Sequence, residues 1–600
     1  MFKRVAVSGV TIALALVLEH ATNASAMYSD GLMIVAAIIA GLPILISAIR
    51  ALKVKNISID LLVSIAAIGA IFVGNYWEAA AVTFLFALGH ALETRTMNKT
   101  RAALSELIEV APETATVIRD GQQVEVDPGQ VQPEEIVVVK PGATVPVDGV
   151  VRTGVATINE ASITGESIPA EKGEGDQVYA GTVSTSGAIH VKATGIGSDT
   201  TLARIIRRVE DAQDAKAKTQ TFLERFSTWY TPAIIVLALV TGLITRDVTL
   251  ALTLLVVGCP GALVISIPVA IVAGIGRGAR SGLLIKGGEY LETAARIDAV
   301  ALDKTGTLTS GTPQLVDVLV PATVPGTSKD EVLRLAAAIE TYSEHPLAGP
   351  IVEFADGTPA TDVEPITGRG IVGTVEGKRV AVGNRSLLND DHLLGIAAEQ
   401  EQLGRTAMFV TVDGRGVGVI SVADSIREDA KEMVDELHAA GVKKVVMLTG
   451  DAQRVAEAVA REVGIDEVHA GLLPEDKQAV IEKLQAEGYT VGMVGDGVND
   501  APALATANTG IAMGAAGTSV AIETADIALM RDDMLALPQA IRLAKKTVRI
   551  MRQNIVVSLL TVVALMAGIF AGDVTMAIGM LVHEASVLLV IVNAMRLLRA

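Results

Sequence analysis

The residues best suited to chemistry lie at the end of an apolar run, where Asp303 opens the segment Asp-Lys-Thr-Gly-Thr at 303–307. The run before it, 298–302, has the composition of a buried strand, so Asp303 is expected at the carboxyl end of that strand. Open α/β sheets bind their ligands in the crevice at these ends. A carboxylate there can attack a phosphoryl group and form an acyl phosphate, which divides one difficult hydrolysis into two easier steps. The pattern predicts that Asp303 is a nucleophile.

Two further apolar runs end in polar segments, Thr-Gly-Asp at 449–451 and Gly-Asp-Gly-Val-Asn-Asp at 495–500. Any one such segment is more often a simple turn, but parallel strands bring their carboxyl ends to one edge, so all three could meet. The two aspartates of the second segment would repel Asp303 unless a hard cation such as Mg²⁺ lay among them. Lys477 is expected to be the counter-charge for phosphate.

A second reactive group lies in apolar segments, where Gly-Cys-Pro-Gly at 258–261 interrupts a long hydrophobic run. Pro260 removes the helical bond to the carbonyl of Val256, and the glycines loosen the turn. Backbone oxygens and the Cys259 sulfur are therefore expected to face a site near the middle of a membrane. Inert packing of the cysteine beside an ordinary kink is the plain alternative.

The last apolar run carries Met580, His583, Glu584 and Ser586. A charged residue at the centre of a membrane helix costs about 2.5 to 3.5 kcal/mol on insertion scales, so such residues mark an ion path by default. The sulfur of Cys259, a nitrogen of His583 and an oxygen of Glu584 together suit Zn²⁺, Cd²⁺, Co²⁺ or Fe²⁺. The thiolate pair that favours Cu⁺ is missing, because the chain has a single cysteine.

The composition indicates that membrane helices and soluble domains position these residues. Hydrophobic residues make up 50% and charged residues 19% of the 600, too apolar for a soluble chain and too charged for an all-membrane one. Apolar runs that approach the ~20 residues needed to span a bilayer cover 5–18, 30–49, 58–75, 77–93, 229–244, 248–272, 553–571 and 574–595. The first run could be a cleaved signal peptide. Retained, it makes eight helices, and the basic residues then place both termini in the cytoplasm.

Pro43 lies inside the second apolar run and should bend that helix. The residues after it could form an amphipathic stretch at the membrane surface or pack as an ordinary helix.

Two soluble inserts separate the apolar hairpins, at about 96–225 and 275–548. The first is rich in Val, Ile, Thr and Gly with turn signals, which is typical of a compact β domain. The second alternates apolar runs with helical stretches and predicts a doubly wound α/β sheet, interrupted by an α+β subdomain at about 311–420. The net charge of −18 and the lack of a basic tract argue against nucleic acid as a partner. A single cysteine excludes internal disulfides, zinc ribbons and dithiol redox sites.

The three polar segments resemble the P-type ATPases, whose signature is matched letter for letter at 303–307, with Thr-Gly-Asp at 449–451 and Gly-Asp-Gly-Val-Asn-Asp-Ala-Pro-Ala-Leu at 495–504. The resemblance implies a membrane α-helical bundle of about eight helices, a β actuator domain, and a haloacid-dehalogenase-like α/β phosphorylation domain containing an inserted α+β nucleotide-binding domain. The implied parts are 1–95 (two N-terminal helices and the first core hairpin), 96–225 (actuator), 226–275 (third and fourth core helices), 276–310 with 421–548 (phosphorylation domain), 311–420 (nucleotide-binding domain) and 549–600 (last two helices).

The resemblance also implies ATP as the fuel and a phosphate ester on Asp303. The other residues implied here are Thr305 and Asp496, which with Asp303 would bind Mg²⁺, and the catalytic group Thr449, Lys477 and Asp500. Many related phosphatases carry a general-acid aspartate where this chain has Thr305, so the phosphoenzyme should persist. Thr-Gly-Glu-Ser at 164–167 matches the actuator loop of the family, and Glu166 is implied to orient or deprotonate the attacking water.

Ser-Glu-His-Pro-Leu-Ala at 343–348 and Gly-Arg-Gly at 368–370 resemble the nucleotide-binding domain of the heavy-metal branch, type IB. Taken alone, either segment is a turn, because the glycines lack the strand and helix of a dinucleotide site. The residues implied to contact adenine or ribose are Glu344, His345, Gly368 and Gly370.

The membrane motifs resemble type IB but are composite. Cys-Pro-Gly replaces the Cys-Pro-Cys or Ser-Pro-Cys of known subgroups, and His-Glu-Ala-Ser at 583–586 resembles cobalt- and iron-exporting members. The aspartate and the lysine of zinc and cadmium pumps are missing from the last two helices. We expect a divalent-metal exporter that holds its ion with Cys259, His583 and Glu584, with Met580 and Ser586 as further candidates.

Glu78 matches in position a glutamate proposed as the exit in zinc-type members, with a solvated helix end as the equal alternative. A Cu⁺ exporter using Cys259 and Met580 is the second hypothesis. A membrane-tethered phosphatase or metal sensor is the third, disfavoured by Thr305 and by the buried pair His583 and Glu584. We expect a monomer in the lipid bilayer. Its chain should cross a bacterial plasma membrane several times and keep its soluble domains in the cytoplasm.

Overall fold

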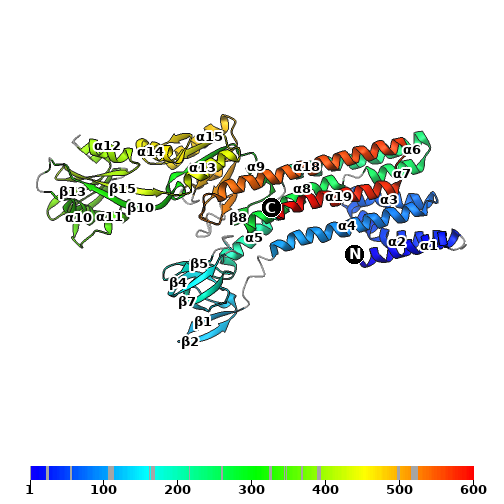
Figure 1. Ribbon diagram of the computed structural model, residues 1–600, viewed down its shortest axis with the longest axis horizontal. Helices are drawn as coiled ribbons and strands as arrows, with labels where there is room; N and C mark the ends of the chain where they lie inside the picture. Colours follow the sequence, from blue (N-terminus) through cyan, green and yellow to red (C-terminus); the bar gives the residue numbers. More distant parts are fainter. Residues whose placement is uncertain are drawn as a thin grey trace. The chain divides into compact units, whose positions relative to one another are not determined.

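The structure is a computed structural model with two compact units, Met1–Ala295 with Arg542–Ala600, and Arg296–Ile541 (Figure 1). The residues it describes are 2–21, 26–54, 57–105, 114–160, 163, 169–214, 217–258, 261–322, 324, 327–343, 345, 347–366, 369–387, 393–495, 500–514 and 525–599.

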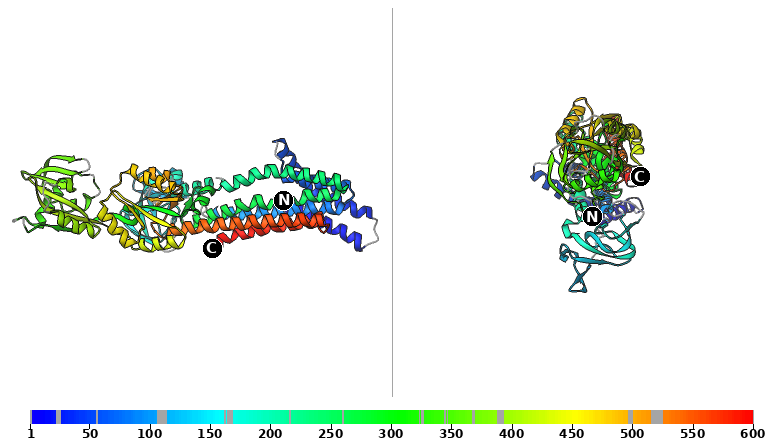
Figure 2. Two further views of the ribbon diagram at one scale, coloured as in Figure 1. Left: turned by 90° about the horizontal axis from the view of Figure 1, so that it is seen from above. Right: turned by 90° about the vertical axis from the view of Figure 1, so that its left-hand side faces the viewer.

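Long helices that run alongside one another make up most of the first unit (Figure 2). They are α1 (Phe2–Ala21), α2 (Ala26–Lys53), α3 (Ile59–Phe72), α4 (Tyr76–Ser105), α6 (Lys218–Thr245), α7 (Val248–Val257), α8 (Gly261–Arg280), α18 (Ala536–Ala571) and α19 (Met576–Arg599). A helix lies in every predicted apolar run, and α7 and α8 share one run. By length and composition, five spans in the described chain could cross a membrane: Met27–Lys53, Lys218–Thr245, Val248–Arg280, Ala536–Ala571 and Met576–Leu598. The protein is an integral, multi-pass membrane protein.

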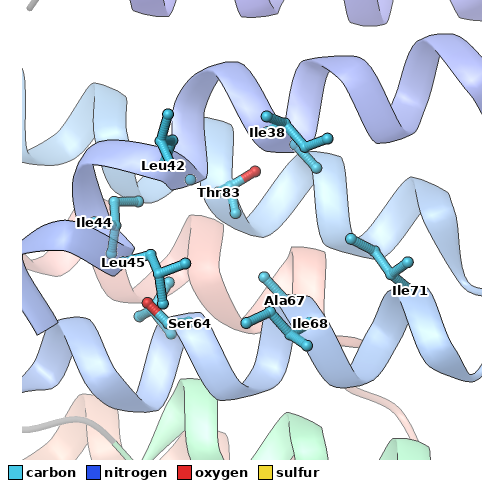
Figure 3. A pocket seen from close by; sticks show the side chains of 12 residues that line it. Ile38, Leu42, Ile44, Leu45, Ser64, Ala67, Ile68, Ile71 and Thr83 are labelled. Carbon is cyan, nitrogen blue, oxygen red and sulfur yellow. The ribbon is translucent and has the colours of Figure 1, made fainter. Parts of the chain in front are cut away.

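The helix α2 continues through Pro43 from Ala26 to Lys53. Beside the proline, α2, α3 and α4 enclose an apolar pocket of about 120 Å³, where Leu42, Leu45 and Thr83 lie close together (Figure 3). Beyond the proline Ala48 is fully buried, whereas Ile46, Ile49 and Leu52 are 41%, 47% and 51% exposed, so this segment has one buried side and one exposed apolar side.

The β insert of the first unit is an antiparallel sheet in the order β2-β1-β3-β7-β4-β5, with β6 on β4. Its strands are β1 (Ala115–Arg119), β2 (Gln122–Val126), β3 (Ile136–Val139), β4 (Asp148–Asn159), β5 (Ala170–Lys172), β6 (Gln177–Val178) and β7 (Val183–Gly195). Valine and isoleucine alternate inward, as Val137, Val139, Ile189 and Val191 show. The Asp148 carboxylate accepts the N–H of Thr201 at 2.6 Å, which fixes the start of α5 (Thr201–Asp214) to the sheet.

A parallel sheet forms the core of the second unit, with the strand order β17-β16-β9-β18-β19-β20. Its strands are β9 (Ala299–Asp303), β16 (Lys444–Leu448), β17 (Glu467–His469), β18 (Val491–Gly495), β19 (Thr509–Ala512) and β20 (Ile527–Leu529). The intervening helices are α13 (Ala430–Ala439), α14 (Gln453–Val463), α15 (Pro474–Ala486) and α16 (Ala501–Thr506). Every residue of β9 is buried, as expected for a central parallel strand.

An antiparallel sheet in the order β10-β15-β14-β13-β12-β11 interrupts this α/β core. Its strands are β10 (Thr309–Leu319), β11 (Ala360–Ile366), β12 (Gly370–Val375), β13 (Lys378–Gly383), β14 (Thr406–Val412) and β15 (Arg415–Ile426), with α10 (Lys329–Glu340), α11 (Gly349–Val352) and α12 (Leu394–Gln402). The predicted fold class is confirmed, with a helical bundle, a β domain and an α/β domain that contains an α+β insertion.

Candidate functional site

Asp303 is the last residue of β9, between two parallel neighbours. It pairs in register with Leu448 of β16, and Leu302 pairs with Val494 of β18. The segments that follow these three strands therefore begin at one edge of the sheet, as the sequence predicts.

Lys477, on α15, joins the carboxylates of this edge. Its Nζ lies 2.6 Å from Asp303 Oδ1 and 2.7 Å from Asp500 Oδ1. Burial, together with the charge of Asp500, raises the pKa of Asp303 to about 6, although Lys477 opposes the rise. Burial lowers the pKa of Lys477, but the two carboxylates outweigh it and the pKa is raised overall. Lys477 therefore stays protonated and holds both oxygens.

The glycine at the end of β18 determines where the Asp500 carboxylate can lie. A Cβ at Gly495 would lie 2.5 Å from Asp500 Oδ2, so only glycine lets this carboxylate pack against the end of β18. Gly306, in the loop after Asp303, has φ of +71° and also needs glycine. Thr305, next to it, is exposed.

The end of β16 adds a second ion pair, between Lys304 and Asp451. Thr449 is buried, and its Oγ1 accepts the N–H of Asp451 at 3.1 Å. Thr449 thus shapes the turn that presents Asp451 to Lys304.

The donors at this edge fit Mg²⁺. Asp303 and Asp500 share one ammonium group, which leaves net negative charge on oxygen atoms, and a set of oxygen donors is what Mg²⁺ prefers. Asp303 and Thr305 are the described residues that would hold it. Asp496 and the actuator glutamate Glu166 lie outside the described residues.

A cavity of about 720 Å³ lies in the inserted domain, between the end of α10 and the strands β11 to β14. His345 and Gly370 line it, whereas Glu344 and Gly368 lie outside the described residues. A Cβ at Gly370 would overlap the carbonyl oxygen of Val382, so this close approach requires glycine. The volume suits a nucleotide-sized ligand.

Glu340 also lines this cavity, although the sequence did not predict it there. It ends α10, is 3% exposed, and burial raises the pKa of its carboxyl. The available signal was a glutamate that closes an apolar helical run, but such a residue is usually solvated.

A polar cavity of about 330 Å³ lies within the helical bundle of the first unit. His583 and Glu584 of α19 line it, and His583 is 3% exposed, with no hydrogen-bond partner for Nδ1 in the described structure. A Cβ at Gly89 would overlap the Glu584 carboxylate, so this glycine of α4 makes room for it. Cys259 and Pro260 lie outside the described residues.

Three other ionisable residues line this cavity and were also missed: Asp60 of α3, and His90 and Glu93 of α4. His90 Nδ1 and Glu93 Oε2 are 3.5 Å apart. Within the described residues, no three His, Cys, Asp or Glu side chains are grouped tightly enough to hold an ion. The structure thus gathers possible ligands in one cavity without a closed coordination shell.

The remaining candidates face elsewhere. Met580 is 1% exposed and packs in an apolar cluster. Ser586 donates to the carbonyl of His583 at 2.6 Å. Glu78 is 7% exposed and accepts the N–H of Ala577 at 2.5 Å, so its description as a solvated helix end is wrong.

Comparisons with known proteins agree with this arrangement. The family of haloacid dehalogenase-like hydrolases matches residues 297–508, and the P-type ATPase actuator domain matches residues 109–210. A cadmium-transporting ATPase of Staphylococcus aureus is 41% identical over 90% of this chain and 77% of its own length. A relative named a probable copper-exporting P-type ATPase V, from Mycobacterium tuberculosis, is 42% identical over 86% of this chain and 70% of its own.

A crystal structure of a zinc-transporting PIB-type ATPase is 37% identical and covers 99% of both chains, with a TM-score of 0.58. A second crystal structure of a zinc-transporting PIB-type ATPase, in another state, has the same identity and coverage and a TM-score of 0.52. Both its sequence and its architecture show that this chain belongs to the P-type ATPases, in their metal-transporting type IB branch.

Proposed function

We propose that this protein uses ATP to export a divalent transition-metal ion, Zn²⁺, Cd²⁺, Co²⁺ or Fe²⁺, across the membrane through an aspartyl phosphate on Asp303. The observation that carries the metal assignment is the buried Nδ1 of His583, which has no partner in the described structure and lies beside Glu584 in a cavity of the bundle. A neutral imidazole nitrogen and a carboxylate suit such ions.

In the phosphorylation step, a carboxylate oxygen of Asp303 attacks the γ-phosphorus of ATP, and the bond to the bridging oxygen breaks so that ADP leaves with its electron pair. The nucleophile must be ionised, which a pKa of about 6 allows at neutral pH. Lys477 holds the carboxylate and offsets charge on the incoming phosphate. Mg²⁺ bound by Asp303, Thr305 and Asp496 would neutralise the charge on the phosphate oxygens.

The cavity of the inserted domain is proposed to bind the adenosine of ATP. Glu340, His345 and Gly370 line it, and the buried carboxyl of Glu340 is suited to recognise an amino group of the base. Glu344 and Gly368 are proposed to complete this site.

Dephosphorylation is assigned to Glu166, which would direct water onto the phosphorus. Because Thr305 cannot act as the general acid found in related phosphatases, the ester should last long enough for the membrane cavity to change. Export requires that the protein bind the ion with different affinities before and after phosphorylation.

The transported ion is proposed to bind His583 and Glu584, together with the sulfur of Cys259. Asp60, His90 and Glu93 extend the polar lining of the cavity and would attract a cation. Glu78 remains a candidate for the exit.

Export of Cu⁺ is the second candidate function, because one relative carries a copper-exporting name. Cys259 and Met580 would then supply the ligands. The apolar packing of Met580 disfavours this alternative.

One titration tests the proposal, with the purified protein acting as a monomer in lipid vesicles. ATP hydrolysis and the acid-stable phosphoenzyme are measured against Zn²⁺, Cd²⁺, Co²⁺, Fe²⁺ and Cu⁺. Stimulation by one or more divalent ions, with uptake of that ion into inside-out vesicles, is expected. Stimulation by Cu⁺ alone would support the copper alternative, and hydrolysis indifferent to every metal would end the proposal.

A further inference from the structure

The helix α18 buries one stripe of side chains and exposes the rest. Val556, Leu560 and Val563 are 54%, 64% and 58% exposed, as expected for a surface in contact with lipid. Asn554 is 0% exposed and lies on the buried stripe. An amide buried inside a membrane bundle needs partners, because no water is available to it.

The partners of Asn554 lie on two other helices. Its Nδ2 donates to the carbonyl of Ser266 on α8 at 3.4 Å and to that of Val590 on α19 at 3.3 Å. Its Oδ1 accepts from Asn593 of α19 at 2.8 Å, which orients the amide so that the nitrogen faces both carbonyls. One side chain thus bridges α8, α18 and α19.

The proposed ligands His583 and Glu584 lie on one partner helix, α19, and Cys259 comes two residues before the start of the other, α8. Val590 lies seven residues, about two helical turns, after His583. Ser266 lies seven residues after Cys259 and five after Gly261, which lines the polar cavity. The bridge therefore ties the ligand-bearing segments together on the cytoplasmic side of the cavity.

We propose that Asn554 is a positioning residue for the transported ion, because it sets the separation of α19, which carries His583 and Glu584, from α8, which follows Cys259 in the sequence. The inference rests on the proposed function. The two carbonyl bonds lie at the long end of the hydrogen-bond range, which suits a contact that must loosen when the helices move.

Two variants and a matched control test this role in the full-length protein. Asn554→Leu keeps the branching of the side chain at Cγ and removes the amide, whereas Asn554→Gln keeps the amide. Ser558→Ala is the control, because Ser558 lies one turn further on α18 and is 1% exposed, and within the described residues its hydroxyl donates to the carbonyl of Asn554 on its own helix.

In Asn554→Leu, the Zn²⁺ or Cd²⁺ concentration for half-maximal ATPase should rise about tenfold, with a smaller change in kcat. Phosphorylation by inorganic phosphate without metal, which does not need the ion ligands, should stay near wild type. Asn554→Gln should recover part of the loss, and Ser558→Ala should behave as wild type. A normal half-saturation in Asn554→Leu, or an equal shift in Ser558→Ala, overturns the proposal.

Amide hydrogen exchange separates this inference from the proposed function. Exchange in 261–280 and 576–599 should be faster in Asn554→Leu than in wild type or Ser558→Ala, whether or not metals stimulate hydrolysis. Unchanged exchange in Asn554→Leu would show that Asn554 does not hold these helices together. Faster exchange in a protein that no metal stimulates leaves the bridge in place and refutes the metal assignment instead.

Discussion

The carboxylates at the edge of the parallel sheet around Asp303 are paired with lysines, whereas His583 in the membrane cavity keeps an unpaired ring nitrogen among the described residues. At the sheet edge, Lys477 joins Asp303 to Asp500 and Lys304 pairs with Asp451. In the cavity, Nδ1 of His583 has no partner among the described residues. The catalytic edge is therefore assembled before any ligand arrives, and the cavity keeps ligand capacity for an ion.

The difference follows from how each region is built. Hydrogen-bonded register between parallel strands fixes where their ends lie, to within a residue. Helices in a bundle have no such register, and small residues such as Gly89 and Gly579 decide how closely they pack. A site between helices can thus change its spacing more easily than one at strand ends.

The largest effect is expected from a substitution of Asp303 at the edge of the parallel sheet. Asp303→Asn should lower ATP turnover by at least about 1,000-fold, because the amide cannot attack phosphorus. No acid-stable phosphoenzyme should form from labelled ATP. Asp317→Asn is the control and should label normally. Asp317 lies on β10, where it is paired with Lys329 of α10. An ester formed by Asp303→Asn would show that another residue is the nucleophile.

The next largest effect is expected from a substitution in the membrane cavity that leaves the sheet edge unchanged. His583→Ala should lower metal-stimulated hydrolysis by at least about 100-fold, because a ligand nitrogen is lost. Phosphorylation from inorganic phosphate should persist, since the sheet edge is untouched. His190→Ala, in the β domain, should hydrolyse ATP normally. Full metal stimulation in His583→Ala would place the ion elsewhere.

Asp303 illustrates what could be predicted from the sequence, because apolar runs followed by polar segments identify strand ends. Lys477 was also foreseen, and the structure brings it to Asp303. The cavity was only half foreseen. His583 stands out as an ionisable residue in an apolar run, but His90 and Glu93 look like ordinary residues near a helix end.

Their membership in the cavity depends on how α3, α4 and α19 pack, which has no local signature. Glu340 was missed for the same reason, since burial of its carboxyl depends on strands far along the chain. The domain boundaries remain predictions.

A moderate effect is expected when the positive charge of Lys477 is removed from the sheet edge. Lys477→Met should slow phosphorylation by roughly 100-fold, because a charged donor at the phosphate is lost. Lys477 also opposes the raised pKa of Asp303, so its removal should raise that pKa further above about 6. The attacking form is the carboxylate, so phosphorylation is present above this pKa and lost as pH falls through it. The acid limb of the pH profile should therefore move to higher pH.

Lys483→Met is the matched control for this charge, because Lys483 is an exposed lysine on the same helix, α15. Its pH profile should match wild type. A profile in Lys477→Met that also matches wild type would contradict the electrostatic role.

A smaller effect comes from shape at the same edge. Gly495→Ala places a methyl group 2.5 Å from Asp500 Oδ2 and should slow phosphorylation by roughly tenfold, because the carboxylate is displaced. Gly395→Ala, on α12, meets nothing within 4 Å and should leave the rate unchanged. Equal rates in the two variants would show that the edge tolerates movement of Asp500.

The smallest effect concerns Glu78, which accepts the N–H of Ala577 at the start of α19. Glu78→Ala removes the acceptor at a helix N-terminus and should lower the free energy of unfolding by about 1 kcal/mol, measured by thermal unfolding in detergent. Glu78→Gln keeps an acceptor oxygen and removes only the charge, so a residue that serves as a cap alone should leave turnover and stability close to wild type. If Glu78 also receives the departing ion, Glu78→Gln should instead slow metal release and turnover while stability stays normal. The Gln variant thus decides whether Glu78 only caps α19 or also takes part in release of the ion.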